Sequence, residues 1–304
     1  MWQAERLAGK GDIISVIIPA HNEGANLPDT VNCILTQSQH PDLEVVVVDD
    51  SSSDGSTQRL IQRFGADKRV RLVRASNLGV AGARNRGAAE ACGDIFVFID
   101  GHCYTPPGWL PQLTAPLADP EAGMIGPAFA SLQHGNGARG MGVRWLGPDL
   151  SYEWLPQQGE TPYAVPLITG GCQAIRRTLF ETLGGYDDGM TRWGSEDVEI
   201  SLRVWLMGYQ VLMHPQVVIY HLFRKTFPYA VDKAGVIHNR LRLAMLHLSE
   251  DRLAKVIDCY RQDPDFSRSL IMLLEGDAIQ RRRKLLERRV RDDDWYFSRF
   301  ACPI

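Results

Sequence analysis

This chain of 304 residues is 44% hydrophobic and can bury a core large enough for one large α/β domain or two smaller ones. Its formal charge of −3 gives no reason to expect nucleic acid as a partner. Its 6 cysteines form no CxxC pair, which argues against a disulfide scaffold and is typical of a reducing compartment. Residues 1–10 do not resemble a signal peptide, and no apolar run approaches the ~20 residues that span a bilayer. We therefore expect a soluble, cytoplasmic protein.

Strand and helix patterns alternate along the first half of the chain. Four short apolar runs have the length and composition of buried parallel strands: residues 13–19, 43–48, 70–73 and 95–99. Helical patterns separate them, with apolar stripes at residues 27–35 and 60–64 and a small-residue segment at residues 82–91. This alternation predicts an α/β fold, with a parallel sheet covered by helices on both faces.

The pattern is looser in the middle of the chain. Further strands are expected at four places: residues 124–130, 165–168, 211–213 and 217–219. Residues 134–142, which include four glycines, indicate a mobile loop. Residues 196–207 indicate a helix that ends at Gly208.

The C-terminal part is helical or polar from residue 239 onward. Residues 281–291 are strongly basic, which predicts the solvated face of a helix, with peripheral contact to an anionic membrane as the second interpretation. We expect one catalytic domain over residues 1–248 and a helical extension over residues 249–304.

Polar residues follow three of the four predicted strands. The first strand continues into Pro19-Ala20-His21-Asn22-Glu23, the second into Asp49-Asp50 and the fourth into Asp100-Gly101-His102. Ligands of an open parallel sheet bind outside the carboxyl ends of its strands, so these groups should line one crevice. Loop polarity alone would explain any one of them. Their occurrence together favours a binding site.

Asp100 and His102 are two residues apart where a strand ends, so a carboxylate and an imidazole can turn toward one metal ion. The first strand does not lead into a GxGxxG turn, and the chain has no lysine-bearing Walker loop that would bind phosphates. A diphosphate would therefore need another cation. One carboxylate, imidazoles and phosphate oxygens suit Mn²⁺, and the nitrogen ligands make Mg²⁺ the second choice. His221, which follows the strand at residues 217–219, is the candidate third ligand.

Glu196 and Asp197 are adjacent at the start of a predicted helix, so they point about 100° apart and can do different jobs. A helix N-terminus also attracts acidic residues through its dipole, which is the structural alternative. The preceding Trp193-Gly194 favours the functional interpretation, because an aromatic face is a common sugar platform. Gly170-Gly171 indicates either a turn or a place where a substrate meets bare backbone.

Several segments carry a resemblance to a known family: PAHNE, VVVVDDSSSDGS, FIDGHC followed by PGWL, GGYDDGMTRWGSEDVEISLRVWLMGY and HLFRKTFPYAV. Over residues 13–245 the chain resembles the GT-A fold enzymes of inverting glycosyltransferase family two. Within that group it is most similar to the catalytic domain of polypeptide N-acetylgalactosaminyltransferases. The resemblance implies a Rossmann-like GT-A fold with a mainly parallel central sheet, a UDP-sugar donor and Mn²⁺.

The resemblance also implies roles for individual residues. The implied Mn²⁺ ligands are Asp100, His102 and His221. The implied uridine contact is Asp49 or Asp50, with Pro19, His21 and Glu23 nearby, and Arg84 is the implied contact of the nucleotide. Trp193 and Glu196 are implied in the donor and acceptor pocket, together with Gly170 and Gly171. The segment around Arg224, Lys225 and Tyr229 resembles a lid.

The chain departs from the peptide-modifying enzymes at Asp197, where they normally have Asn and retain the anomeric configuration. Inverting family-two enzymes place a catalytic Asp there, and inversion needs a general base within reach of the acceptor hydroxyl. We therefore expect inversion, with Asp197 as the base and Glu196 beside it. The lack of a lectin-like domain and of a membrane anchor favours a soluble, bacterial-type enzyme.

The expected activity is metal-dependent transfer of a sugar from a UDP-sugar to an acceptor hydroxyl. The acceptor stays open among a peptide, a glycan, a lipid-linked sugar and a small molecule. Residues 134–162, with Trp145, Tyr152 and Trp154, are expected to shape its site. The alternatives are a retaining peptide Ser/Thr O-glycosyltransferase and a catalytically silent sugar-nucleotide-binding protein. A nucleotidyltransferase is disfavoured, because the first loop lacks glycine-rich, lysine-bearing character.

Overall fold

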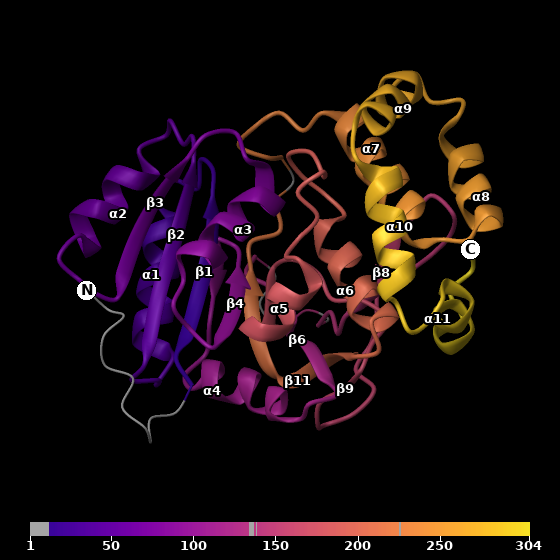
Figure 1. Cartoon of the computed structure of the whole chain (residues 1–304). Helices are drawn as coiled ribbons and strands as arrows, with labels where there is room; N and C mark the ends of the chain where they lie inside the picture. The colour runs from indigo at the N-terminus through magenta and orange to yellow at the C-terminus, as the bar shows by residue number, and fades with distance from the viewer. Residues whose placement is uncertain (1–11, 134–136, 138, 225) are drawn as a thin grey trace.

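The computed structural model describes residues 12–133, 137, 139–224 and 226–304, so part of the predicted 134–142 loop lies outside it. The central mixed sheet is built from these strands: β1 (Ile14–Ala20), β2 (Leu43–Asp50), β3 (Val70–Ala75), β4 (Ile95–Ile99), β5 (Cys103–Tyr104), β6 (Ala122–Ser131), β9 (Tyr163–Ala164), β10 (Cys172–Arg176) and β11 (Gln210–His221). Their order is β3-β2-β1-β4-β10-β6-β11-β5, and β9 pairs with β11. The neighbouring strands β3, β2, β1 and β4 can be followed in Figure 1. A second, two-stranded sheet consists of β7 (Val143–Trp145) and β8 (Tyr152–Trp154).

The amino-terminal half confirms the predicted alternation. β3, β2, β1 and β4 pair in parallel. The intervening helices are α1 (Asn26–Gln37), α2 (Ser56–Phe64) and α3 (Gly79–Glu90). α1 and α2 bury their apolar residues against one face of the sheet, and α3 packs on the other. The small residues of α3 allow a close approach, since a Cβ on Gly87 would lie 2.4 Å from Ile17 Cγ2.

The strand predicted at residues 165–168 is wrong. The strand β10 comes after the double glycine instead, and it runs antiparallel to both β4 and β6. Residues 165–168 are a buried loop, in which the indole N–H of Trp205 donates to the carbonyl oxygens of Val165 and Pro166 at 3.1 and 3.0 Å. An apolar run indicates that a segment is buried but not that it is a strand. A loop can be buried when side chains make hydrogen bonds to its backbone groups.

The two strands predicted at residues 211–213 and 217–219 are one strand, β11. It pairs in parallel with β6, and its register shifts between His214 and Val218. Polar residues lie at this shift and interrupt the apolar pattern of the sequence. The sequence therefore indicates two strands where the structure has one.

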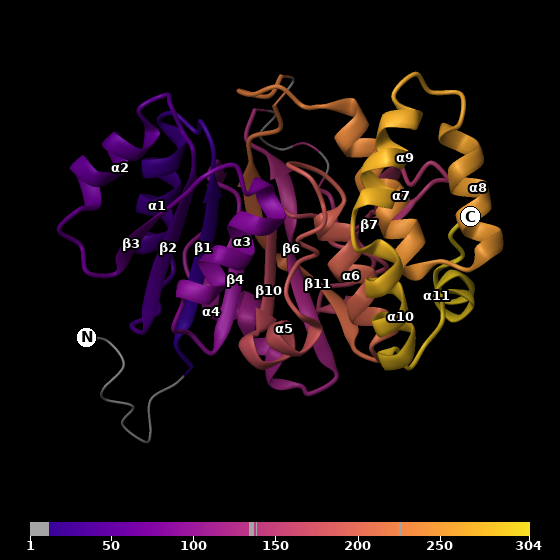
Figure 2. The same ribbon diagram turned by 45° about the horizontal axis from the view of Figure 1, so that its top comes forward.

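The remaining helices follow β5 in the chain: α4 (Trp109–Thr114), the 3-10 helix η1 (Ala115–Ala118), α5 (Arg177–Leu183), α6 (Glu196–Leu206), α7 (Lys233–His247), α8 (Glu250–Tyr260), α9 (Phe266–Glu275), α10 (Ala278–Arg288) and α11 (Asp293–Phe300). The C-terminal helices gather at the far end of the molecule from α1 and α2 (Figures 1 and 2).

Trp145, expected at the acceptor site, is instead buried in the core against Tyr296 and Phe297, at ring-centroid distances of 5.8 and 5.9 Å. Among the described residues, no helix is long and apolar enough to cross a membrane.

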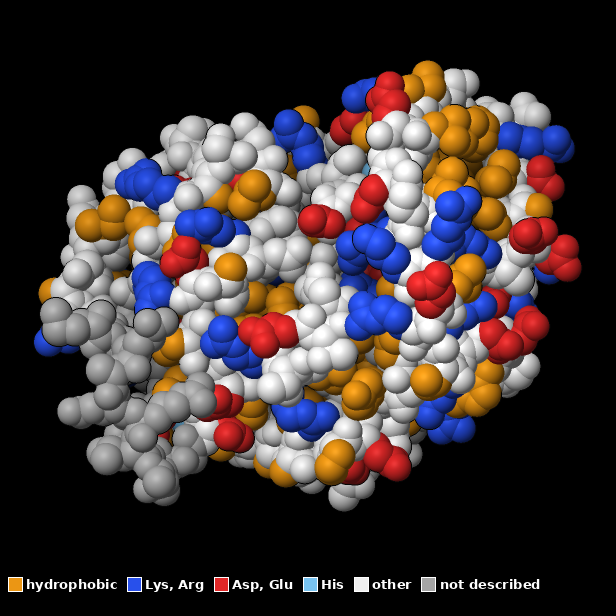
Figure 3. Space-filling view, viewed as in Figure 1, with side chains coloured by type: hydrophobic (Ala, Val, Ile, Leu, Met, Phe, Trp, Pro, Cys, Tyr) orange, Lys and Arg blue, Asp and Glu red, His pale blue; other side chains and the backbone are white. Residues whose placement is uncertain are grey.

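The basic run at residues 281–291 is only partly a solvated helix face. Arg283 and Lys284 are exposed on α10, over which basic side chains gather (Figure 3). Arg282 and Arg289 instead turn inward and donate to the carbonyl oxygens of Leu248 and His247 at 2.9 and 3.1 Å. These carbonyls lie at the C-terminal end of α7, where cations complement the unpaired oxygens and the helix dipole. The predicted solvated face is therefore wrong for these two arginines.

Candidate active site

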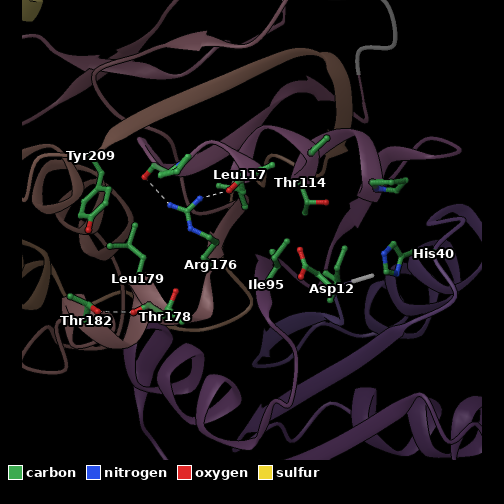
Figure 4. Close-up of a pocket in the computed structure, with 15 residues that line it drawn as sticks. Asp12, His40, Ile95, Thr114, Leu117, Arg176, Thr178, Leu179, Thr182 and Tyr209 are labelled. Carbon is green, nitrogen blue, oxygen red and sulfur yellow. Dashed lines mark hydrogen bonds between the residues drawn. The ribbon is translucent and has the colours of Figure 1, made fainter. Parts of the chain in front are cut away.

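Two cavities lie at opposite ends of the strands. One of about 690 Å³ is at the amino ends of β1 and β4, where Ile14 and Ile95 line it (Figure 4). Its arginine, Arg176, is already engaged, since its guanidinium donates to backbone carbonyls of residues 117–120. The other cavity, of about 860 Å³, lies at the carboxyl ends of the strands, where a parallel sheet binds its ligands.

The larger cavity brings together nearly all of the residues that the sequence predicts for the site. Those that line it are Pro19, His21, Glu23, Asp50, Arg84, Asp100, His102, Gly170, Gly171, Trp193, Glu196, Asp197, His221, Arg224 and Tyr229. Lys225 lies outside the residues that the structure describes.

Asp49 does not line the cavity, because side chains alternate between the two faces of a strand. The Asp50 carboxylate accepts hydrogen bonds from the backbone N–H groups of Leu78 and Gly79, both at 2.9 Å, where α3 begins. Asp49 accepts from the backbone N–H of Ser52 at 3.0 Å. Of the two aspartates that the sequence offers for the uridine, the cavity contains Asp50.

The side chains of Asp100, His102 and His221 converge on one point. Each offers a ligand atom within 4.8 Å of the other two, and Asp100 Oδ2 lies 3.3 Å from His221 Nε2 and 4.0 Å from His102 Nε2. Burial alone would raise the pKa of Asp100, but the hydrogen bond with His221 and the His102 and Arg84 groups hold that pKa well below its usual range. An ionised carboxylate with two imidazoles is a donor set that fits a divalent transition metal.

Arg84 connects this cluster to the start of α6. Its side chain is 1% exposed, and its guanidinium donates to Glu196 Oε1 at 3.0 Å, Asp100 Oδ1 at 3.3 Å and the carbonyl oxygen of Gly170 at 2.8 Å. A Cβ on Gly170 would lie 2.7 Å from Arg84 Nη2. The first glycine of the pair therefore makes room for this arginine, a reason that the sequence did not reveal.

Glu196 and Asp197 point in different directions from the first turn of α6, as predicted. Glu196 faces Arg84 and accepts from the Gly194 backbone N–H at 3.1 Å. Asp197 accepts from the Gly170 backbone N–H at 2.7 Å. Burial and the charge of Asp197 raise the pKa of Glu196 to about 7, against the opposing effect of Arg84. Burial also raises the pKa of Asp197.

Aromatic side chains form the walls of the cavity. Trp193 lies against Phe227, with ring centroids 4.9 Å apart. Tyr152 and Trp154, both from β8, also line the cavity. Burial, together with the Asp100 and Glu23 charges, raises the pKa of Tyr229 to about 12, so its hydroxyl is neutral at physiological pH.

Asn239, which was not predicted from the sequence, lies in α7 and holds the loop before α6. Its side-chain amide donates to the carbonyl oxygens of Thr191, Trp193 and Gly194 at 2.8, 3.2 and 2.8 Å, and its Oδ1 accepts from the Thr191 backbone N–H at 2.8 Å. The loop needs this support, because it includes Ser195 in the left-handed region at φ 71°. Nothing in the sequence singles it out, because α7 contains other polar residues, among them His238, Arg240 and Arg242.

We predict that Asn239→Ala destabilises the protein, because it leaves three partly buried carbonyls and one partly buried N–H without this partner. The expected loss in the free energy of unfolding is about 1–3 kcal/mol or more, measured by urea denaturation. The control is Gln58→Ala, which removes an exposed amide from α2. Equal stability of the two variants would contradict the assigned role of Asn239.

Comparisons with solved structures agree with this architecture. A crystal structure of GalNAc-T7 with UDP, GalNAc and Mn²⁺ matches with a TM-score of 0.77 at 21% identity, covering 95% of this chain and 56% of that one. A mannosyltransferase from Pyrobaculum calidifontis in complex with GDP-Man and Mn²⁺ matches with a TM-score of 0.56 at 21% identity, covering 92% and 75%. The fold is therefore an α/β fold of the GT-A type, with a helical C-terminal region.

Sequence comparisons identify the family. Mouse (Mus musculus) polypeptide N-acetylgalactosaminyltransferase 10 is 30% identical over an alignment of 311 positions that covers 95% of this chain and 50% of the relative. The chain thus spans about half the length of the curated relatives it matches. A model of the N-terminal domain of galactosyltransferase matches residues 157–226. The model of glycosyl transferase family 2 matches residues 15–184, more than half of the chain, and the chain belongs to that family.

Proposed function

We propose that this chain transfers a sugar from a UDP-sugar to an acceptor hydroxyl and that the reaction depends on Mn²⁺. The observation that carries the proposal is the convergence of Asp100, His102 and His221 in the same cavity as Asp197. The related GalNAc-T7 structure, which contains UDP and Mn²⁺, supports the choice of nucleotide and metal.

Asp100, His102 and His221 are the proposed metal ligands. When bound, Mn²⁺ would supply the positive charge that stabilises a departing diphosphate. Arg224, which lines the cavity on the segment after β11, is placed to add a second positive charge to that leaving group.

Asp197 is the proposed general base. It takes the proton of the acceptor hydroxyl while that oxygen bonds to the anomeric carbon. The bond between this carbon and the diphosphate oxygen breaks, and its electron pair leaves with UDP. Burial raises the pKa of Asp197, which makes its carboxylate a stronger base than a solvated one. The hydrogen bond from the Gly170 N–H keeps one carboxylate oxygen oriented.

The acceptor is proposed to bind between β8 and the C-terminal helices. Tyr152 and Trp154 line this part of the cavity from β8, while Val236, Arg240 and Met272 line it from α7 and α9. Aromatic faces suit a sugar ring or the side chains of a peptide. The similarity to polypeptide N-acetylgalactosaminyltransferases makes a peptide hydroxyl the first acceptor to test and a retaining reaction the alternative to inversion.

We predict metal-dependent release of UDP from at least one member of a panel of UDP- and GDP-sugars. EDTA should abolish the release, and Asp100→Asn should lower it by about 10²–10³-fold because it removes the charged ligand. Glu181→Gln removes an exposed carboxylate and serves as the control. Release that is unaffected by EDTA, or a chain that does not bind UDP in the presence of Mn²⁺, would contradict the proposal.

Asp197→Asn should lower the transfer rate by about 10²–10⁴-fold, since the amide cannot accept the acceptor proton. Affinity for UDP with Mn²⁺ should stay within about twofold, because Asp197 is not among the proposed ligands. The measurements are transfer to a hydroxyl acceptor and calorimetric titration with UDP. Wild-type turnover in this variant would rule out Asp197 as the base, and NMR of the product anomer distinguishes inversion from retention.

A further inference from the structure

Glu23 lies between the metal cluster and the segment that follows β11. Its side chain is 7% exposed. His102 Nδ1 is 3.1 Å from Glu23 Oε2, and the Arg224 guanidinium contacts the same oxygen through Nη2, with Nη1 3.5 Å from Oε1. One buried carboxylate therefore contacts both a candidate metal ligand and a candidate diphosphate-binding arginine.

The loop that carries Glu23 is fixed by the turn after β2. The Asn22 backbone N–H donates to Ser52 Oγ at 3.0 Å, and the Gly24 backbone N–H donates to Asp54 Oδ2 at 2.6 Å. These contacts hold the residues on both sides of Glu23. The position of its carboxylate is thus set by the fold rather than by a ligand.

Gly101 gives the loop after β4 its close contact with Glu23. A Cβ at this position would lie 3.0 Å from Glu23 Cγ and 3.4 Å from Cδ. The glycine between Asp100 and His102 therefore leaves space for the Glu23 side chain to pass beneath the loop. This packing is independent evidence that Glu23 and the two flanking ligands form one unit.

The contact with His102 determines which ring nitrogen is free. A hydrogen bond donated by Nδ1–H to a carboxylate selects the tautomer in which Nε2 carries a lone pair, and it also fixes the plane of the ring. His102 Nε2 is the ring nitrogen that faces Asp100 Oδ2, at 4.0 Å. Glu23 therefore presents the lone pair of His102 toward the other two ligands.

We propose that Glu23 is the positioning residue of this site, orienting His102 for the metal and holding Arg224 beside it for the diphosphate. This inference rests on the proposed function for the identity of the ligands. The orientation of His102 itself can be measured without metal or nucleotide.

The first test is the Mn²⁺ affinity of the full chain, measured by calorimetry and by electron paramagnetic resonance. Glu23→Ala should weaken Mn²⁺ binding by about 10–100-fold, the usual effect of losing an outer partner of a metal ligand. Glu23→Gln keeps an acceptor oxygen and should recover part of the affinity. Glu181→Gln, the surface control, should bind as the parent does. Parent-like affinity in a folded Glu23→Ala would overturn the inference.

The second test concerns Arg224. At saturating Mn²⁺, Glu23→Ala and Arg224→Gln should each lower the affinity for UDP. The double variant should have the same affinity for UDP as the single variant with the larger loss. Such non-additivity is expected if Glu23 acts on the nucleotide by placing Arg224. Fully additive losses would show that the two residues act separately and would overturn this half of the proposal.

The third test separates this inference from the proposed function. Long-range ¹H–¹⁵N NMR spectra of the metal-free chain should show His102 as the Nδ1–H tautomer and a mixture of tautomers in Glu23→Ala. If the parent shows this tautomer but binds neither Mn²⁺ nor UDP, the proposed function fails and the positioning role stands. If His102 has the same tautomer in both proteins, the positioning role fails whatever the enzyme does.

Discussion

The buried guanidinium of Arg84 is the interaction on which the geometry of the site depends. Its three acceptors come from distant parts of the chain: Asp100 after β4, Glu196 at the start of α6 and the carbonyl of Gly170 before β10. A buried charge is tolerated only when it is paired and hydrogen-bonded, so these segments must meet where Arg84 places its donors. Loss of Arg84 would leave two carboxylates without their shared cation. The proposed metal ligands and the proposed base are thereby fixed relative to one another.

Local contacts then adapt each segment to this arrangement. Gly87 lets α3 approach β1, which brings Arg84 to the end of the sheet. Gly170 leaves room for the guanidinium, and Asn239 holds the loop that leads into Glu196. The glycines and the buried asparagine are therefore constraints of packing rather than of chemistry. This packing sets the pKa values of the titratable groups: burial, together with the charge of Asp197, raises the pKa of Glu196 to about 7.

The first four strands and the place of the site could be predicted, because apolar runs of strand length and polar strand ends are local signals. The segment at residues 165–168 misled the prediction, since a buried loop has the same apolar composition as a strand. The strand β10 lies between β4 and β6 and pairs antiparallel with both, and no local sequence pattern encodes this pairing. Asn239 and the core position of Trp145 depend on how the C-terminal helices pack, across long separations in the chain. Contacts of this kind appear only in the folded chain.

We propose that one metal ion, held by Asp100, His102 and His221, lies beside the diphosphate of a nucleotide in the larger cavity. Diffraction from crystals grown with UDP and Mn²⁺, recorded on both sides of the manganese absorption edge, tests this most directly. We predict one anomalous peak within about 2.5 Å of a carboxylate oxygen of Asp100 and of one ring nitrogen of each histidine, next to density for the diphosphate. A peak at another site, or UDP bound in this cavity with no anomalous peak beside it, would contradict the claim.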